Sequence, residues 1–361
     1  MKRSSILTAI ILAAAALMAS FQNCYACTGI TLKAKDGSTV VARTIEWAAS
    51  DNDCRWVVVP RGHSWKSFIP GGGTGRSFTN VYGYVGVSVV QDELMMEGVN
   101  EKGLSAGLFY FPDYGKYEEY SEANYETNIS DFQLVSYILG RCATVDEVKA
   151  EIARVHIHGF DPRSSTVHWR FAEPSGRQIV LEIIDGKCVF YENKLGVLTN
   201  SPSFDWQLTN LNNYVNLLPG RTKPHTLGNM PLSSFGGGSA MIGLPGDFTP
   251  PSRFVRAAFF QSTAPQKPDA EGSVFTAFHI LGSMEIPIGA QFPVDETPAD
   301  IPSATQCTCV TDMSGLRFYY RSMYDGGIRC IDLKEIDFKK IGLKSEPLVP
   351  SKKEFVHHIR F

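Results

Sequence analysis

The sequence predicts an α+β fold dominated by antiparallel β-sheets. Three pairs of β-rich segments are each joined by a short polar turn containing glycine, which is typical of β-hairpins. Strands joined by so tight a turn run antiparallel, because parallel strands need a long crossover connection. Helical periodicity is confined to a few segments, so we expect helices packed against antiparallel sheets and not a doubly wound parallel sheet.

The first predicted hairpin pairs 27–32 with 39–47, and its turn contains Asp36-Gly37, a strong two-residue hairpin pattern. Two similar hairpins follow, and three more strands are expected near the C-terminus. The second hairpin is 94–99 with 104–111, the third is 177–184 with 187–192, and the late strands are 305–310, 316–320 and 328–332.

Four segments have the patterns of helices. In 130–141, Val135, Ile138 and Leu139 lie on one apolar stripe. Thr144 followed by Glu147 is a capping-box pattern, which predicts a short helix that ends at 153. The other two predicted helices are 252–261 and 273–281.

Composition and charge exclude several classes of protein. The 361 residues are 43% hydrophobic and 20% charged, as in an ordinary globular protein. With 34 basic and 37 acidic residues, the net charge of −3 is too balanced for a nucleic-acid binder, and we expect no nucleic-acid partner.

The N-terminal segment has the pattern of a secretory signal peptide. Lys2 and Arg3 precede an apolar run at 6–18 that is too short for a membrane anchor, and a polar stretch follows it. Cleavage is expected after Ala26. The sequence therefore predicts that residues 1–26 are removed, that 27–361 form a single domain, and that the protein is exported to the periplasm or secreted without a membrane span.

Two features of this organisation stay open. Within the domain, 340–361 is a candidate for a loosely packed tail. The alternative to a free Cys27 is a lipoprotein in which this residue is acylated, although Cys24 occupies the position where lipoproteins usually carry leucine. Seven cysteines remain after cleavage, and an odd count in an exported chain indicates a thiol with a separate role, while the disulfide pairing is undetermined.

Cys27 is the candidate for that role. As the first residue of the processed chain it would carry a nucleophilic thiol and a free α-amino group together. The amino group has an ordinary pKa of about 7.7–8.0, so it can accept the thiol proton near neutral pH. A thiol needs only modest activation to act as a nucleophile, so no separate histidine is required.

The turn also predicts a register. A two-residue turn at Asp36-Gly37 places Cys27 directly opposite Glu46, whose carboxylate could then orient the terminal ammonium. Simple alternation puts Arg43 on the other face of the strand, so it would reach the thiol only if the strand bulged or twisted near its end. On residue type alone, both charges would be interpreted as a solvated strand edge.

Several motifs resemble those of the choloylglycine hydrolase family, which are N-terminal-nucleophile enzymes that include bile salt hydrolases and penicillin V acylases. The motifs occur in the family's order across nearly the whole processed chain. They are Cys-Thr-Gly-Ile at 27–30, Ala-Arg-Thr-Ile-Glu-Trp at 42–47, Asn-Glu-Lys-Gly-Leu at 100–104, Leu-Thr-Asn-Ser-Pro-Ser-Phe-Asp at 198–205, Leu-Pro-Gly-Asp at 244–247, Pro-Ser-Arg-Phe-Val-Arg at 251–256, Phe-His-Ile-Leu-Gly-Ser at 278–283 and the segment 319–325.

The resemblance implies a role for each matching residue. Cys27 matches the nucleophile and Arg43 the arginine beside it. Asn200 matches the asparagine whose side chain helps to form the oxyanion hole, and the backbone N–H of Tyr110 would complete that hole. Arg253 matches an arginine that positions the cluster.

The resemblance also implies a four-layer αββα sandwich, hydrolysis of a linear amide C–N bond, no metal or cofactor, and a homo-oligomer, commonly a tetramer. The expected substrate is a conjugated bile salt or a penicillin V-like N-acyl amide with an apolar acyl group. Tyr110 resembles the acylases at this position, while Glu46 departs from the family's usual Asp. The alternatives are an acyl-homoserine lactone acylase and a catalytically silent exported binding protein of the same fold.

Overall fold

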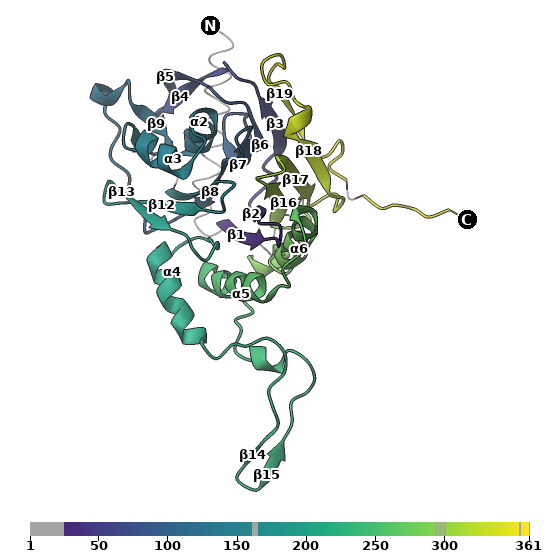
Figure 1. Cartoon of the computed structure of the whole chain (residues 1–361). Helices are drawn as coiled ribbons and strands as arrows, with labels where there is room; N and C mark the ends of the chain where they lie inside the picture. The colour runs from purple at the N-terminus through teal and green to yellow at the C-terminus, as the bar shows by residue number, and fades with distance from the viewer. Residues whose placement is uncertain are drawn as a thin grey trace.

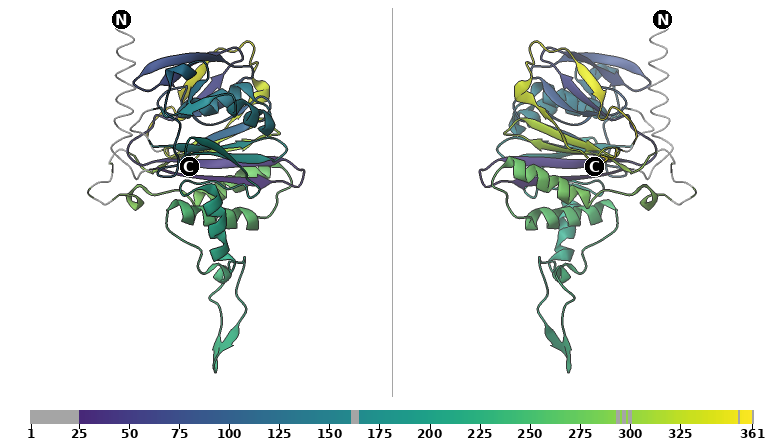
Figure 2. Two further views of the ribbon diagram at one scale, coloured as in Figure 1. Left: turned by 90° about the vertical axis from the view of Figure 1, so that its left-hand side faces the viewer. Right: turned by 90° about the vertical axis from the view of Figure 1, so that its right-hand side faces the viewer.

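A computed structural model describes residues 25–160, 165–292, 295, 298, 301–353 and 355–360. Two antiparallel sheets pack face to face, and helices cover the outer face of each, so the layers run helix, sheet, sheet, helix (Figures 1 and 2). This is the predicted αββα arrangement. Most of the predicted signal peptide, residues 1–24, lies outside the described residues.

The five-stranded sheet joins the two ends of the described chain. Its strands follow the order β1-β2-β16-β17-β18, so the N-terminal hairpin pairs with strands from the C-terminal third. Every residue of β2 is buried, because this central strand is covered on both faces. The bounds are β1 Tyr25–Lys33, β2 Thr39–Trp47, β16 Thr305–Asp312, β17 Arg317–Ser322 and β18 Arg329–Asp332.

The eight-stranded sheet forms the other inner layer. Its order is β13-β12-β11-β8-β7-β6-β3-β19, and all of its strand pairs are antiparallel. The bounds are β3 Arg55–Val59, β6 Tyr84–Ser88, β7 Met95–Asn100, β8 Ser105–Tyr110, β11 Val167–Ala172, β12 Gln178–Ile184, β13 Lys187–Glu192 and β19 Lys344–Pro347.

The four predicted helices are present with bounds close to the predicted ones. Helices α5 and α6 pack on the five-stranded sheet, and α2 and α3 cover the other sheet. The side chain of Thr144 caps α3 by accepting from the Glu147 N–H, as the capping pattern predicts. The helices are α2 Leu134–Arg141, α3 Val145–Ile152, α4 Phe204–Asn210, α5 Pro250–Thr263 and α6 Ala270–Gly282.

Smaller elements decorate this sandwich. Three two-stranded pairs are β4 Ser64–Ile69 with β5 Gly73–Thr79, β9 Asn128–Ser130 with β10 His156–His158, and β14 His225–Leu227 with β15 Met230–Leu232. Short 3-10 helices are η1 Glu122–Asn124, η2 Asp131–Gln133, η3 Leu211–Tyr214, η4 Ser239–Met241, η5 Ile288–Ala290 and η6 Leu333–Glu335. No helix among the described residues has the length and apolar composition needed to cross a bilayer.

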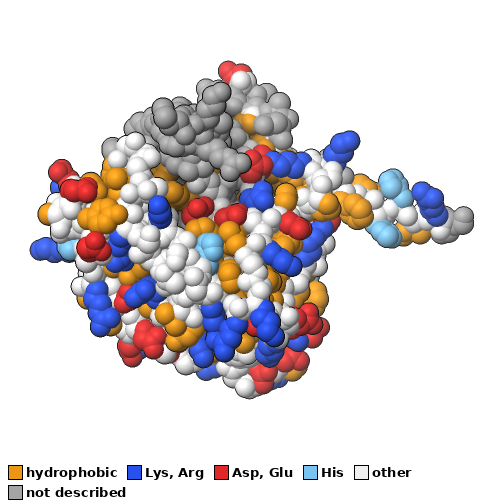
Figure 3. All heavy atoms as spheres, turned by 90° about the horizontal axis from the view of Figure 1, so that it is seen from above, with side chains coloured by type: hydrophobic (Ala, Val, Ile, Leu, Met, Phe, Trp, Pro, Cys, Tyr) orange, Lys and Arg blue, Asp and Glu red, His pale blue; other side chains and the backbone are white. Residues whose placement is uncertain are grey.

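Two segments leave the body of the sandwich. Residues 215–246, here called the arm, project away from it and end in the β14–β15 hairpin (Figures 1 and 2). In the predicted tail, β19 pairs with β3 and the next two residues, Leu348 and Val349, are buried, so the first part of 340–361 is attached to the sheet. Residues 355–360 are exposed and extend outward (Figure 3).

The loop between β1 and β2 differs from the predicted two-residue turn. The Ala34 N–H donates to the Ser38 carbonyl at 2.9 Å, and the Gly37 N–H donates to the Ala34 carbonyl at 3.1 Å. These bonds enclose a three-residue loop, and Gly37 adopts a left-handed conformation with φ 89°. A turn followed by a left-handed glycine is the common way to close a hairpin with one residue more than the tightest turn.

The extra loop residue makes the predicted register wrong by one position. Cys27 lies opposite Ile45, and Ala26 lies opposite Glu46. Because side chains alternate along a strand, a shift of one residue moves each side chain to the other face relative to its partner strand. Arg43 therefore shares a face with Cys27, and no bulge is needed to bring them together.

Replacement of Gly37 tests how strongly this loop fixes the hairpin. Gly37→Ala should lower the free energy of unfolding by about 1 kcal/mol, because a side chain disfavours the left-handed conformation although space is available. Urea unfolding measures the change. Gly246→Ala is the control, because Gly246 has equal space and no positive φ. Equal stability of the two variants would contradict the role assigned to Gly37.

Candidate active site

Cys27 lies in β1 between the two sheets and is 3% exposed. Its side chain belongs to a buried cluster with Ile30, Phe109 of β8 and Phe254 of α5. The thiol is therefore enclosed by three of the four layers. Ala26, which precedes it in β1, is also buried, against Ala48, Ile286 and Ala304.

Arg43 contacts the thiol directly. Its Nη2 lies 2.7 Å from Cys27 Sγ, and the residue is fully buried. The guanidinium also donates to the backbone carbonyls of Thr44, Met96 and Leu108. These bonds fix the orientation of the guanidinium, so one N–H group points at the sulfur.

Asn200 and Arg253 hold the backbone of Cys27. The Cys27 N–H donates to Asn200 Oδ1 at 2.8 Å, and Arg253 Nη2 donates to the same oxygen at 2.8 Å. Arg253 Nη1 donates to the Cys27 carbonyl at 2.5 Å and to Thr28 Oγ1 at 2.8 Å. Helix α5 thereby places a cation beside Cys27 in β1, and Arg253 orients both the backbone of Cys27 and the side chain of Asn200.

The amide orientation of Asn200 follows from its neighbours. Two N–H donors face Oδ1, whereas Nδ2 donates to the carbonyl of Tyr110 at 2.8 Å. A flipped amide would oppose like groups on both sides. Tyr110 ends β8, so the partner of Asn200 comes from the sheet opposite to that of Cys27.

Glu46 lies in β2, is 3% exposed, and accepts from Thr305 Oγ1 at 3.1 Å through Oε1. Its Oε2 is buried and has no hydrogen-bond partner among the described residues. Burial raises the pKa of this carboxyl to about 7, against the opposing effects of Arg253 and Arg43.

The charges around Cys27 act on its protonation in opposite directions. Burial is the largest effect and raises the pKa of the thiol, because a thiolate is poorly solvated there. Arg43 and Arg253 lower the pKa, and Glu46 raises it. The thiolate thus depends on the two arginines for its stability.

All six predicted site residues gather at this point, and neither Arg43 nor Glu46 lies at a solvated strand edge. Sequence reasoning missed Thr305, which binds Glu46, and two buried charges behind Arg43, namely Glu97 in β7 and Arg170 in β11. In the sequence, Glu97 and Arg170 are visible only as charged residues inside otherwise uncharged strand segments, and a solvent-facing position would explain that pattern equally well.

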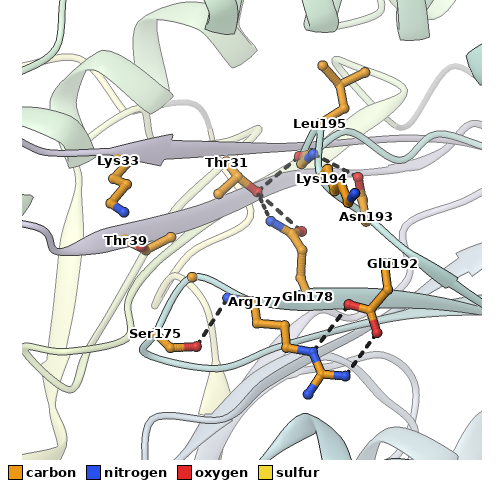
Figure 4. Close-up of a pocket in the computed structure, with 12 residues that line it drawn as sticks. Thr31, Lys33, Thr39, Ser175, Arg177, Gln178, Glu192, Asn193, Lys194 and Leu195 are labelled. Atoms are coloured by element: carbon orange, nitrogen blue, oxygen red, sulfur yellow. Dashed lines mark hydrogen bonds and ion pairs between the residues drawn. The ribbon is translucent and has the colours of Figure 1, made fainter.

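A pocket of about 400 Å³ lies at the other end of the β1–β2 hairpin (Figure 4). None of the six site residues lines it. Its polar groups largely satisfy one another, since Thr31 bonds to Gln178 and Gly196, and Arg177 pairs with Glu192. This pocket is therefore separate from the thiol site.

Comparisons with known proteins identify the family of this chain. Residues 27–346 match the family model described as linear amide C–N hydrolases, choloylglycine hydrolase family. The chain is 31% identical over 316 residues to the bile salt hydrolase/transferase of Clostridium perfringens, covering 86% of this chain and 93% of that protein. It is 28% identical to the penicillin V acylase of Pectobacterium atrosepticum, covering 84% and 79% of the two chains.

A solved structure supports the fold as well. A crystal structure of conjugated bile acid hydrolase from Clostridium perfringens has a TM-score of 0.79 and 28% sequence identity, and the match covers 92% of this chain and 100% of that one. The family model begins at Cys27, the residue around which the buried cluster is built. The chain belongs to the choloylglycine hydrolase family and is a hydrolase of linear amide C–N bonds.

Proposed function

We propose that residues 1–26 are removed on export to the periplasm or beyond and that Cys27 then acts as the N-terminal nucleophile. The observation that carries this proposal is the pair of contacts made by Cys27. Its sulfur meets Arg43 at 2.7 Å, and its backbone nitrogen meets Asn200 at 2.8 Å. Removal of Ala26 would convert that nitrogen into a primary amine while leaving its acceptor in place.

Glu46 is suited to the new amine. Its Oε2 has no hydrogen-bond partner among the described residues while Ala26 is attached, and Ala26 is the residue directly opposite it. Cleavage removes that strand partner and generates a group with three N–H donors when protonated. We therefore assign Glu46 as the carboxylate that holds the ammonium, a role reached from the strand end and not from the cross-strand position predicted by the sequence.

The reaction then follows ordinary covalent catalysis. The amine accepts the thiol proton, and the thiolate attacks the amide carbonyl. The second N–H of Asn200 Nδ2 and the backbone N–H of Tyr110 would stabilise the oxyanion. The leaving amine takes the proton and departs, and water hydrolyses the thioester to release the acid and regenerate the thiol.

The proposed substrate is an N-acyl amide with an apolar acyl half, either a conjugated bile salt or penicillin V. This assignment rests on the relatives named above, whose sequences match most of this chain. Tyr110 at the oxyanion position favours the acylase type by family resemblance. No metal or other cofactor takes part in the proposed steps.

Substitution of the nucleophile tests the proposal. Cys27→Ser should reduce hydrolysis of taurocholate or penicillin V more than about 1000-fold, because a hydroxyl is a far weaker nucleophile than a thiol here. The released amine is quantified for the processed enzyme, whose N-terminus is established by sequencing and intact mass. Cys330→Ser, at an exposed cysteine, is the control and should retain full activity.

Other outcomes of this experiment have definite meanings. Full turnover by Cys27→Ser, or by enzyme in which Cys27 is lipid-capped or still joined to Ala26, would contradict the proposal. Turnover of long-chain acyl-homoserine lactones alone would reassign the substrate. Silence of the correctly processed protein on all three substrates would leave the binding-protein alternative.

The titration of Glu46 gives a second test. In the unprocessed chain, the folded carboxyl has a pKa of about 7, above its ordinary value of 4.5. The folded state therefore binds the proton more tightly, and stability should fall by up to about 3 kcal/mol as pH rises from 4.5 to 7. Glu46→Gln should abolish the part of this pH-dependent fall in stability that comes from Glu46, as measured by urea unfolding at several pH values.

Processing should change this behaviour if Glu46 holds the ammonium. The new positive charge would lower the pKa of Glu46. The fall in the free energy of unfolding between pH 4.5 and 7 should therefore differ less between wild type and Glu46→Gln after cleavage than before it. Asp131→Asn is the matched control, because burial also raises the pKa of Asp131 to about 7, and Asp131 lies in η2, which packs against α2 and β7 and not against the strand of Cys27. If wild type and Glu46→Gln differ as much in the pH dependence of their stability after cleavage as before it, Glu46 does not pair with the Cys27 ammonium.

We also propose that the protein is a homotetramer in which the arm contacts another copy. The arm bears large exposed apolar side chains on a segment that extends beyond the body (Figure 2). Exposed apolar groups at this density are typical of protein interfaces. They are Val215, Leu218, Leu227, Met230, Phe235 and Ile242.

Charges placed on the arm test this assembly. The double variant Leu227→Glu, Met230→Glu should shift the protein from tetramers to smaller species, because it would bury two charges in the contact. Light scattering after size-exclusion chromatography measures the mass. Val81→Glu, at an exposed apolar residue on the body, is the control and should stay tetrameric. Monomeric wild type, or unchanged mass of the double variant, would contradict the proposal.

A further inference from the structure

The guanidinium of Arg43 lies between two groups that its positive charge can stabilise, the Cys27 thiolate and the Glu97 carboxylate. On one side, Nη2 lies 2.7 Å from Cys27 Sγ. On the other, Nη1 lies 3.9 Å from Glu97 Oε2. Glu97 is 1% exposed, so solvent does not screen it. A carboxylate this close to a buried guanidinium would by itself neutralise the charge that the thiolate needs.

Arg170 lies on the far side of Glu97 and changes this balance. Its Nη2 donates to Glu97 Oε1, which also accepts from Ser105 Oγ at 3.3 Å. Arg170 is 1% exposed, and its other guanidinium nitrogens, Nε and Nη1, have no hydrogen-bond partner among the described residues. Its charge is therefore directed mainly to Glu97, which takes its strong contacts from Arg170 and only a longer one from Arg43.

Arg43, Glu97 and Arg170 form a row of buried charges, and the neighbouring residues leave space for it. A Cβ on Gly107 would come within 2.0 Å of Glu97 Oε2, so only glycine leaves space for the carboxylate there. The ring of Phe109 contacts both cations, with Arg43 Cζ at 4.1 Å and Arg170 Cζ at 5.8 Å from its centroid. Adjacent strands β7, β8 and β11 thus supply Glu97, Phe109 and Arg170 from the sheet opposite to that of Cys27 and Arg43.

Other charged and titratable groups face the row. Cys27 faces Arg43 and Glu46 of β2 and Arg253 of α5. Cys309 of β16 faces Arg43 and Arg170. Among the described residues, the cations that act on Glu97 are Arg170 and Arg43, and Arg170 makes the closer contact, so Arg170 is the group that offsets the carboxylate.

We propose that Arg170 is a positioning residue for the nucleophile: by pairing with Glu97, it leaves the charge of Arg43 available to the Cys27 thiolate. This inference rests on the proposed role of Cys27. One negative charge between two positive ones leaves a net positive charge, and the end of the row nearest the sulfur is Arg43. Without Arg170, Glu97 would instead form its ion pair with Arg43.

The reactivity of the thiol tests this role without relying on turnover. In the processed enzyme, the rate of Cys27 alkylation by iodoacetamide is measured from pH 5 to 10 by peptide mass spectrometry. Arg170→Met should slow alkylation at pH 7 by about 10-fold through a rise of about one unit in the thiol pKa. The rate at high pH, where the thiol is fully ionised, should be unchanged.

A second variant separates charge from structure. Removing one partner of a buried ion pair is strongly destabilising, whereas replacing both by neutral groups is tolerated better. Arg170→Met combined with Glu97→Gln should therefore restore alkylation at pH 7 to within about twofold of wild type. The matched control is Arg177→Met combined with Glu192→Gln, which removes an exposed ion pair on the same sheet and should leave the profile unchanged.

The outcomes are distinguishable. A folded Arg170→Met with the wild-type profile, or a double variant as slow as Arg170→Met, would overturn the positioning role. If Arg170→Met does not fold, the comparison of Glu97→Gln with the double variant decides, because equal and fast alkylation of both supports the role and slow alkylation of the double variant overturns it. If the wild-type enzyme turns over none of the proposed substrates but the alkylation profiles are as predicted, the proposed function alone would be refuted and the positioning role would stand.

Discussion

The register of the first hairpin is the constraint on which the site depends. Cys27 and Arg43 lie on neighbouring strands, and they share a face only because the loop has three residues and Gly37 takes a left-handed conformation. A loop shorter by one residue would turn the guanidinium away from the sulfur. The contact at 2.7 Å between Arg43 and Cys27 is thus set by turn geometry at Gly37, ten residues along the chain from Cys27.

Burial strengthens the interaction between Arg43 and the Cys27 thiolate, and it also removes the solvation of both charges. A thiolate between two sheets loses the solvation of water, so its stability depends on cations that the fold supplies. Those cations are themselves buried, and each is held by carbonyls or a carboxylate: Arg43 by β7 and β8, and Arg253 by the loop before α5 and by β1. Every layer except the outer pair α2 and α3 contributes to the charge balance at Cys27.

Much of the fold follows from local patterns. The hairpins, the Thr144 cap and the four helices were predictable because turn residues and apolar periodicity act over a few neighbours. The motifs that resemble those of a known family supplied six candidate site residues, and the structure brings these residues together around Cys27. The register was not predictable, because Asp36-Gly37 suits both a two-residue and a three-residue loop, and the packing of Arg43 against β8 distinguishes them.

The sequence alone determined the class of fold, since hairpin turns and apolar periodicity are short-range patterns. Its resemblance to a known family supplied six candidate site residues, Cys27 among them. Only the tertiary structure decided which charges meet. Glu97, Arg170 and Thr305 are brought to Arg43 and Glu46 by strand pairing and by the stacking of two sheets. Long-range contacts of this kind leave no periodic trace in the chain, because each arises from two segments that satisfy their own local patterns independently.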